Sequence, residues 1–194
     1  DPAGLDAEAW PVAVMTGTGT FSFTPEQRKA LRAYLKAGGT LIADAGGGDE
    51  VFAEAFSREM DRVLPQAKDG LLYKTHPVFT RAGPRIDEVA YRRALQASHG
   101  RRRSPRLTAW LQGNRAMVIF SPADLTAGLI GYQYWGLKGY QPRSSFEVLR
   151  NAILYAGGVK LPRQAEPGGR EPPPGDALEG PPPPDLKPVQ PADR

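Results

Sequence analysis

Residues 24–47, with the sequence TPEQRKALRAYLKAGGTLIADAGG, decide the fold. Thr24 is a good N-cap for a helix, and Gln27 stands where its side chain can bond back to the amide of that cap. Leucines recur at helical spacing behind this start, and the glycines at 38–39 offer a left-handed residue that ends the helix. The apolar residues 40–43 follow at once and predict a short buried strand.

Another strand precedes this helix. Residues 10–15, WPVAVM, form a short apolar run that ends in a glycine-rich turn. Two short strands around one helix form a βαβ unit, in which parallel pairing with a right-handed crossover is strongly preferred. Asp49 then predicts the cap of a second helix, whose apolar residues recur at helical spacing over residues 52–64.

The second half of the chain contains fewer regular patterns. Residues 107–111 and 116–120 flank a turn-forming loop and predict a β-hairpin. Residues 71–73 predict a short strand. A last helix is expected from a serine cap at 144–145 to the glycines at 157–158.

These elements predict one α/β domain over residues 1–161, a three-layer sandwich with a mostly parallel sheet plus the β-hairpin. Within it, residues 83–106 are dense in arginine and poor in periodicity, so we expect a surface insertion of low order. Residues 162–194 are rich in proline and lack the apolar surface that offsets ordering entropy, so we expect a disordered tail.

The composition excludes several kinds of functional site. The chain has no cysteine, which excludes disulfides, thiolate metal sites and a cysteine nucleophile within it. No apolar run approaches the roughly 20 residues that cross a bilayer, so we expect a soluble fragment. The chain begins at Asp1 without a charged and apolar leader, so we expect a processed protein or a piece of a longer one.

The turn after the strand at 40–43 suggests a first resemblance. Helix, Gly-Gly, strand and small-residue turn follow one another between residues 31 and 47, an order that resembles the class I glutamine amidotransferase-like superfamily. In those enzymes the turn displays a nucleophilic cysteine above the sheet. Here Asp44 and Ala45 occupy the turn, so the resemblance implies the fold without its nucleophile.

A larger set of motifs resembles an uncharacterised bacterial family, domain of unknown function 4159, over residues 10–156. The motifs are Gly19 to Phe21, Thr24 to Glu26, Leu31 to Leu35, Gly38-Gly39, Leu41 to Asp44, Phe52, Phe56, Arg58 to Met60, Pro65, His76 to Phe79, and Gly113 through Ser121 to Asp124. The resemblance implies an amidotransferase/flavodoxin-like fold without a recognised catalytic set. It also implies exported or membrane-anchored envelope proteins, often beside MoxR-type ATPases and von Willebrand A proteins.

The chain departs from the family pattern in two places. Ala45 stands where a second acidic residue often follows Asp44, which weakens any paired-carboxylate metal site. The strand and helix that usually lie upstream of Trp10 are absent, so we expect a bare sheet edge or a bare helix-covered face.

The carboxyl end of the strand at 40–43 is the first candidate site. Ligands of open α/β sheets bind beyond the carboxyl ends of strands, and amides at a helix N-terminus suit an anion. Alternatively, Asp49 occupies those amides as an N-cap and Asp44 bonds only to loop backbone. The candidate ligand-binding residues are Asp44, Gly46, Gly47, Gly48, His76, Ser121 and Asp124.

Catalysis is a second hypothesis for the same residues. Asp44, His76 and Asp124 supply acid–base groups and, if the fold brings them together, a trio of metal ligands. A hydrolytic triad has no visible nucleophile, because the chain lacks cysteine and a serine elbow motif. The plainer alternatives are a loop-locking hydrogen bond for His76 and ordinary turn chemistry for Asp124.

Clustered arginines form the third candidate, an anion-binding site. They are Arg92, Arg93, Arg101, Arg102, Arg103 and Arg106. Guanidinium groups attract phosphates and carboxylates, although a solvated insertion whose charge prevents aggregation is the favoured explanation of the cluster. No aromatic residues interleave for base stacking, so we expect no nucleic-acid partner.

Two further segments suggest contacts with a partner. The loop residues Tyr132, Tyr134, Trp135 and Tyr140 form either a partner surface or a cap on the core. The proline runs of the tail can dock on aromatic grooves or act as a spacer.

The preferred hypothesis is therefore a non-catalytic α/β module that binds a protein partner, or a small molecule, within a larger bacterial envelope or periplasmic protein. We expect no cofactor and no bound metal. Membrane attachment is expected only through a region outside this chain. A metal-dependent or hydrolytic enzyme and an anion-binding module remain the alternatives.

Overall fold

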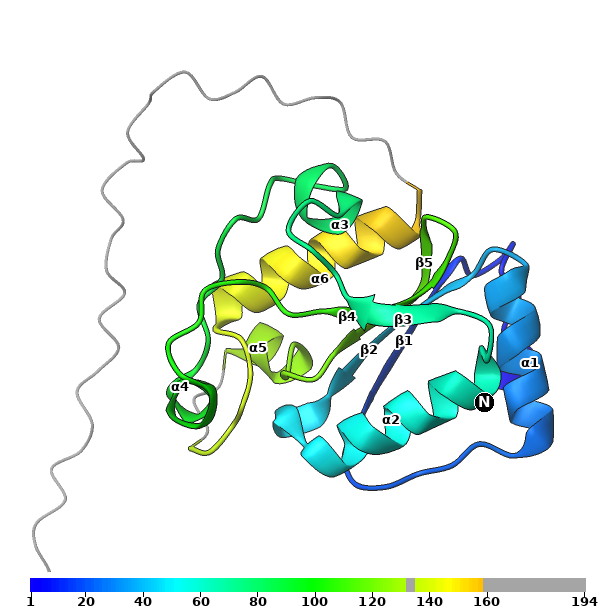
Figure 1. Cartoon of the computed structure of the whole chain (residues 1–194), viewed down its shortest axis with the longest axis horizontal. Helices are drawn as coiled ribbons and strands as arrows, with labels where there is room; N and C mark the ends of the chain where they lie inside the picture. Colours follow the sequence, from blue (N-terminus) through cyan, green and yellow to red (C-terminus); the bar gives the residue numbers. More distant parts are fainter. Residues whose placement is uncertain (132–134, 159–194) are drawn as a thin grey trace, which may run out of the picture. The chain divides into compact units, whose positions relative to one another are not determined.

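The computed structural model describes residues 1–131 and 135–158, which form an α/β domain on a five-stranded mixed sheet (Figure 1). Across the sheet the strands run β1-β2-β5-β4-β3. They are β1 (Val12–Gly17), β2 (Thr40–Ala45), β3 (Lys68–Leu71), β4 (Thr108–Gln112) and β5 (Arg115–Ser121). The α-helices are α1 (Pro25–Lys36), α2 (Glu50–Val63), α3 (Pro77–Thr80), α4 (Arg93–His99), α5 (Thr126–Ile130) and α6 (Pro142–Ala156).

The βαβ unit forms as predicted. The hydroxyl of Thr24 accepts a hydrogen bond from the Gln27 amide at 3.2 Å, and the Gln27 side chain accepts from the Thr24 amide at 2.9 Å. This capping box satisfies two amides that the first turn of α1 otherwise leaves unpaired. Strands β1 and β2 pair in parallel on either side of α1 in the sequence.

The sheet is mixed, which corrects the expectation of a mostly parallel one. The pairs β1–β2 and β2–β5 are parallel, whereas β5–β4 and β4–β3 are antiparallel. The cause is the predicted hairpin, because a tight turn at residues 113–114 can only return the chain antiparallel. Strand β3 lies at residues 68–71, just before the expected position, and pairs with β4 at the sheet edge.

Helices α1 and α2 cover one face of the sheet. Phe56 and Met60 of α2 are fully buried there against the side chains of Trp110 and Phe120. Apolar residues on one stripe of each helix provide this core, as their spacing predicts.

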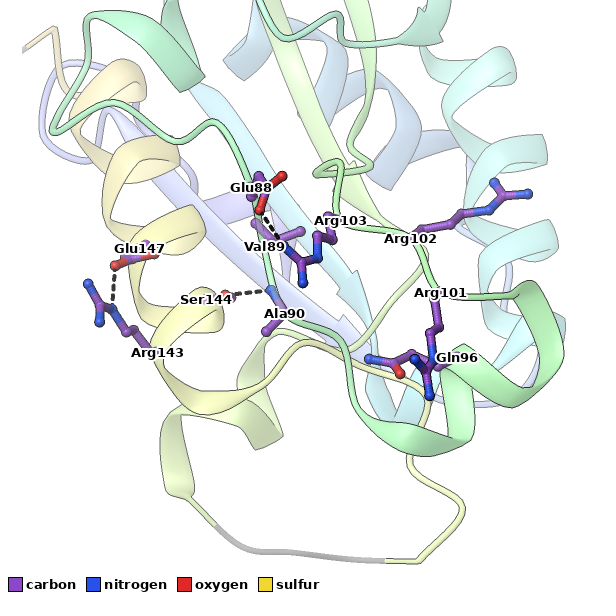
Figure 2. A pocket seen from close by; sticks show the side chains of 10 residues that line it. All are labelled: Glu88, Val89, Ala90, Gln96, Arg101, Arg102, Arg103, Arg143, Ser144 and Glu147. Atoms are coloured by element: carbon purple, nitrogen blue, oxygen red, sulfur yellow. Dashed lines mark hydrogen bonds and ion pairs between the residues drawn. The ribbon is translucent and has the colours of Figure 1, made fainter. Parts of the chain in front are cut away.

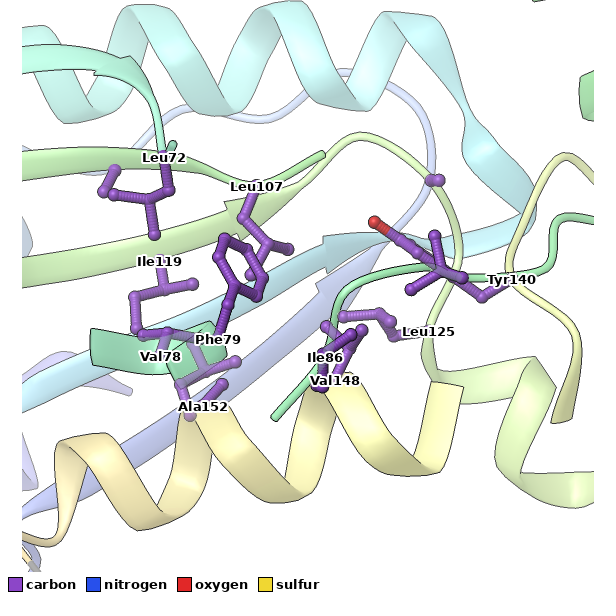
Figure 3. Packing of buried hydrophobic residues seen from close by; sticks show 14 of the residues in the cluster. Leu72, Val78, Phe79, Ile86, Leu107, Ile119, Leu125, Tyr140, Val148 and Ala152 are labelled. Carbon is purple, nitrogen blue, oxygen red and sulfur yellow. The ribbon is translucent and has the colours of Figure 1, made fainter. Parts of the chain in front are cut away.

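Helices α3 and α6 cover the opposite face (Figure 3). Phe79 of α3 and Val148 of α6 are fully buried in this second core with Ile119 of β5. Ile119 and its neighbour Phe120 belong to different cores, because successive side chains of a strand point to opposite faces. The domain is therefore layered helix, sheet, helix.

The expected insertion at residues 83–106 is instead an integral part of the domain. Ile86, Val89 and Tyr91 are all at most 4% exposed and belong to the α6-side core. The Val89 amide donates to the Arg103 carbonyl at 2.7 Å, and this stretch also contains α4. The sequence did not predict this burial, because single apolar side chains on an extended backbone leave no periodic signal.

Strand β1 lies at an edge of the sheet. Within the described ranges it pairs with β2 alone, and Val14 is 59% exposed. No helix in the described part of the chain is long and apolar enough to span a membrane.

The structure describes part of the aromatic loop and none of the proline-rich tail. Tyr140 is buried and its hydroxyl hydrogen-bonds with that of Tyr91 at 3.3 Å, whereas Trp135 is fully exposed. Tyr132, Tyr134 and the proline-rich tail lie outside the described residues.

Candidate functional site

The chain leaves the central parallel strands toward opposite faces of the sheet. After β2 it enters α2 on one face, and after β5 it continues through α5 to α6 on the other. The crevice at the carboxyl ends of two such strands is where open α/β sheets bind ligands. Asp44 and Ser121, paired in the register of β2 and β5, mark this position.

Asp44 is an internal anchor at this position. It is 3% exposed, and its Oδ2 accepts hydrogen bonds from the amides of Leu125 at 2.9 Å and Thr126 at 3.0 Å. Its Oδ1 accepts from the Thr126 hydroxyl at 3.0 Å. Both oxygens are therefore engaged in holding the start of α5.

Asp124, three residues after the end of β5, performs the reciprocal task. Its Oδ2 accepts from the Gly47 amide at 2.5 Å and its Oδ1 from the Ala127 amide at 2.7 Å. Burial raises the pKa of Asp124, although these backbone donors act in the opposite direction and Asp44 adds a further repulsion. The carboxyl group fastens the turn after β2 to the turn after β5.

The glycine turn after β2 is also occupied by the chain itself. Gly48 has φ +71°, and a Cβ at this position would lie 2.2 Å from the Lys138 carbonyl oxygen. The Lys138 amide donates to the Gly47 carbonyl at 3.0 Å, so residues 46–48 are closely covered. The expected ligand site at Asp44, Gly46, Gly47 and Gly48 is thus largely filled by protein groups.

The N-cap role predicted as the alternative for Asp49 is seen, and Ser121 also bonds within the chain. Asp49 caps α2 by accepting from the Phe52 amide at 3.0 Å, and it accepts from the Gly19 amide at 3.0 Å. These donors lower the pKa of Asp49. The Ser121 hydroxyl is fully buried and donates to the Ala123 carbonyl at 2.5 Å.

His76 lies near the start of β5, at the opposite end of the strands from Asp44. Its Nδ1 accepts from the Val78 amide at 3.3 Å, and its ring centroid is 5.3 Å from that of Tyr155. The Tyr155 hydroxyl accepts from the amide of Ala116 at the start of β5, whereas Ser121 ends that strand. At a rise of about 3.3 Å per residue, Ala116 and Ser121 are about 17 Å apart along β5.

The three residues proposed for catalysis therefore do not converge. Asp44 and Asp124 lie at the carboxyl ends of β2 and β5, whereas His76 caps α3 near the opposite end of these strands. No group of three His, Cys, Asp or Glu side chains in the described ranges could hold a metal ion. Burial lowers the pKa of His76, and its Nε2 is buried without a hydrogen-bond partner.

Arg92 does not belong to an exposed anion surface, which corrects one predicted member of the cluster. It is 9% exposed, and its Nε donates to the Tyr140 carbonyl at 3.2 Å. Its own amide donates to the Gly139 carbonyl at 2.8 Å. Arg92 therefore ties the segment before α4 to the segment before α6.

The consecutive arginines instead line a cavity of about 540 Å³ between the α4 region and α6 (Figure 2). We call it the arginine pocket. Its lining comprises Arg101, Arg102, Arg103, Arg143, Glu88, Glu147, Val89, Ala90, Gln96 and Ser144. Arg93 and Arg106 lie outside this lining.

Arg143 is the member of the arginine pocket that the sequence did not indicate. It stands in the first turn of α6, 40 positions beyond Arg103, and only the fold brings it to the cluster. Its Nε donates to Glu147 at 3.0 Å, and Arg103 donates to Glu88 at 3.1 Å. The pocket thus contains four guanidinium groups and two carboxylates.

The family of the chain follows from a comparison with known proteins. Residues 3–156 match the family described as Domain of unknown function (DUF4159). No curated protein matches the sequence. Because the match covers most of the chain, the protein belongs to the DUF4159 family.

Proposed function

We propose that this chain is a non-catalytic binding module that recognises an anionic ligand, the acidic segment of a protein partner, in the arginine pocket. The observation that carries the proposal is the imbalance of charge in the lining of a cavity of about 540 Å³, which four arginines and two glutamates border. Such a cavity attracts carboxylates and phosphates, and guanidinium groups bind both with two parallel hydrogen bonds.

Two of the arginines are ready to bind. Among the described residues, Arg101 makes no hydrogen bond or ion pair with its side chain. Arg102 donates its Nε to the His99 carbonyl at 3.0 Å, which leaves the outer face of its guanidinium group accessible. Both side chains are exposed, so a ligand reaches them without rearrangement of the core.

The other two arginines can exchange partners at low cost. Arg103 is 77% exposed and its partner Glu88 60%, and Arg143 is 91% exposed. Exposed ion pairs contribute only about 0–1 kcal/mol. A ligand carboxylate can therefore replace Glu88 with little loss of stability, and it can reach Arg143 from solvent.

The corner formed by Asp44 and Asp124 favours binding over catalysis. Their oxygens accept backbone hydrogen bonds, and His76 lies near the opposite end of the strands. The enzyme alternative would need these groups to release their partners. The supporting observation for an amidotransferase-like origin is Asp44, which lies near the carboxyl end of a buried parallel strand, where those enzymes carry cysteine.

A location in the bacterial envelope is part of the proposal and rests on the family resemblance alone. Its test is fractionation of a native host with an antibody against this domain. Recovery in the cytosolic fraction would contradict it.

The binding proposal is tested by calorimetry with a hexaglutamate peptide and, separately, inorganic tripolyphosphate. Arg101→Gln combined with Arg103→Gln should weaken binding at least about tenfold, because each charge-assisted hydrogen bond contributes about 1.5–3 kcal/mol. The matched control is Arg81→Gln, an exposed arginine outside the pocket, which should change affinity less than about twofold.

The two probes distinguish the kind of ligand. Binding of the peptide supports an acidic protein segment, whereas binding of tripolyphosphate alone assigns the pocket to a small polyanion. Affinity should fall as salt rises from about 50 to about 200 mM. Absence of binding to both probes, or an equal loss in Arg81→Gln, would refute the proposal.

A further inference from the structure

A second, smaller cavity lies beside the arginine pocket. It has a volume of about 90 Å³ and is bounded by Gly48 and Glu50 after β2 and by Pro122 and Ala123 after β5. We call it the edge pocket. It occupies the crevice at the carboxyl ends of β2 and β5, just outside the corner that the protein closes with Asp44 and Asp124.

We propose that the edge pocket binds one compact oxyanion, either a phosphate ion or the carboxylate of a short aliphatic acid. This goes beyond the proposed function, because only Arg102 borders both pockets. In Figure 2 the side chain of Arg102 extends away from those of Arg101 and Arg103. Arg106 and Lys138 border the edge pocket alone.

Charge favours an anion in the edge pocket. Arg102, Arg106 and Lys138 supply three positive charges, and Glu50 is the acidic residue of the lining. Lys138 Nζ lies 2.7 Å from Glu50 Oε1, so this pair is neutral as a unit. The two arginines and the neighbouring His99 then face a site that holds no other carboxylate among the lining residues.

Arg106 is the group that most requires a partner. The Tyr140 hydroxyl accepts from the Arg106 amide at 3.0 Å and donates to its carbonyl at 3.2 Å, so the backbone is fixed. The residue is half-buried, and its guanidinium makes no hydrogen bond or ion pair with the residues that the structure describes. Removing such a charge from water is unfavourable unless acceptors replace the water, and an oxyanion supplies them.

The size and the apolar wall of the edge pocket restrict the ligand. Tyr91, Leu95, Pro122 and Ala123 form apolar surface beside the cations. Nearby apolar atoms lower the local dielectric and strengthen an ion pair. Because one water occupies about 30 Å³ of liquid, the cavity holds the equivalent of about three waters, which suits a phosphate or a short-chain carboxylate.

The test is titration of the whole chain with inorganic phosphate and with propionate, followed by the backbone amide resonances. We expect saturable shifts at Gly48 and Ala123 with one of the two anions. Arg106→Gln should weaken that binding at least about tenfold. Arg101→Gln, which alters the arginine pocket alone, should leave the anion affinity within about twofold.

The same variants separate this inference from the proposed function. Hexaglutamate binding should depend on Arg101 and not on Arg106, so failure of one proposal leaves the other intact. Lys138→Gln, at a side chain that is 35% exposed, provides a second variant if Arg106→Gln is unstable. Equal anion affinity in the wild type, Arg106→Gln and Lys138→Gln, or no saturation with either anion, would overturn the proposal.

Discussion

Asp44 and Thr126 are 82 positions apart in the chain and are joined by two hydrogen bonds, one from the Thr126 amide and one from its hydroxyl, each 3.0 Å long. The amide of Leu125 adds a third at 2.9 Å. Because Asp44 is the next-to-last residue of β2 and Leu125 precedes α5, these contacts join the two halves of the domain. They account for a buried carboxylate without assigning it a ligand.

Asp44→Ala should destabilise the domain by roughly 2–4 kcal/mol, because it leaves two buried amides without acceptors. Asp44→Asn should cost only about 1 kcal/mol, because its oxygen can accept from the amides while its amino group donates to the Thr126 hydroxyl. Urea unfolding measures both values. Equal stability of Asp44→Ala and the wild type would show that this carboxylate is free for another role.

Glu59 is expected to control stability in acid. It is 1% exposed and accepts hydrogen bonds from Arg28, Arg62 and the Phe23 amide. The Arg28 guanidinium is the main cause that lowers the pKa of Glu59 from 4.5 to about 2. The ionised form therefore stabilises the fold above pH 4.5, and this stabilisation is lost as the pH falls toward 2.

The matched variant for this effect is Glu59→Gln. The wild type should exceed it by up to about 3 kcal/mol at neutral pH, since one pKa unit corresponds to about 1.4 kcal/mol. Below the folded pKa the difference should nearly vanish. Urea unfolding across this pH range gives the difference, and a pH-independent gap would contradict the assignment.

His76 should make the fold sensitive to mild acid. Burial lowers the pKa of His76 below its ordinary 6.5, so the unfolded chain takes up a proton before the folded one does. The contribution of His76 to the free energy of unfolding is therefore fully present above pH 6.5 and is lost as the pH falls below this value. His76→Asn should remove this dependence while keeping an acceptor for the Val78 amide.

The control is His99→Gln, because His99 is the other histidine and is exposed. It should retain the pH dependence of the wild type. If His76→Asn loses stability below pH 6.5 as steeply as the wild type, another group is responsible.

Local signals predicted three features of the domain well. The box formed by Thr24 and Gln27, the Asp49 cap and the hairpin around Gly113 all form as expected. Each depends on residues only a few positions apart, so its stereochemistry is contained in a short stretch of chain. The parallel pairing of β1 and β2 followed from the βαβ unit itself.

Long-range packing produced the errors. Tyr91 and Arg92 become buried because they meet Tyr140 and the segment before α6, about 50 positions later. Arg143 joins the arginine pocket for the same reason. The sequence correctly predicted that Asp44 lies near the end of a strand, whereas Asp124 follows the end of β5 by three residues. The amides that hold both carboxylates belong to turns that the sequence did not relate to one another.

The long-range hydrogen bonds of Asp44 and Asp124 also bear on the order in which the chain folds. They close loops of 77 to 82 residues, which is entropically costly before other contacts have formed. They can form only after β2 and β5 have paired, so they belong to the late, native side of the folding barrier. Loss of the Asp44 carboxylate should therefore speed unfolding far more than it slows folding.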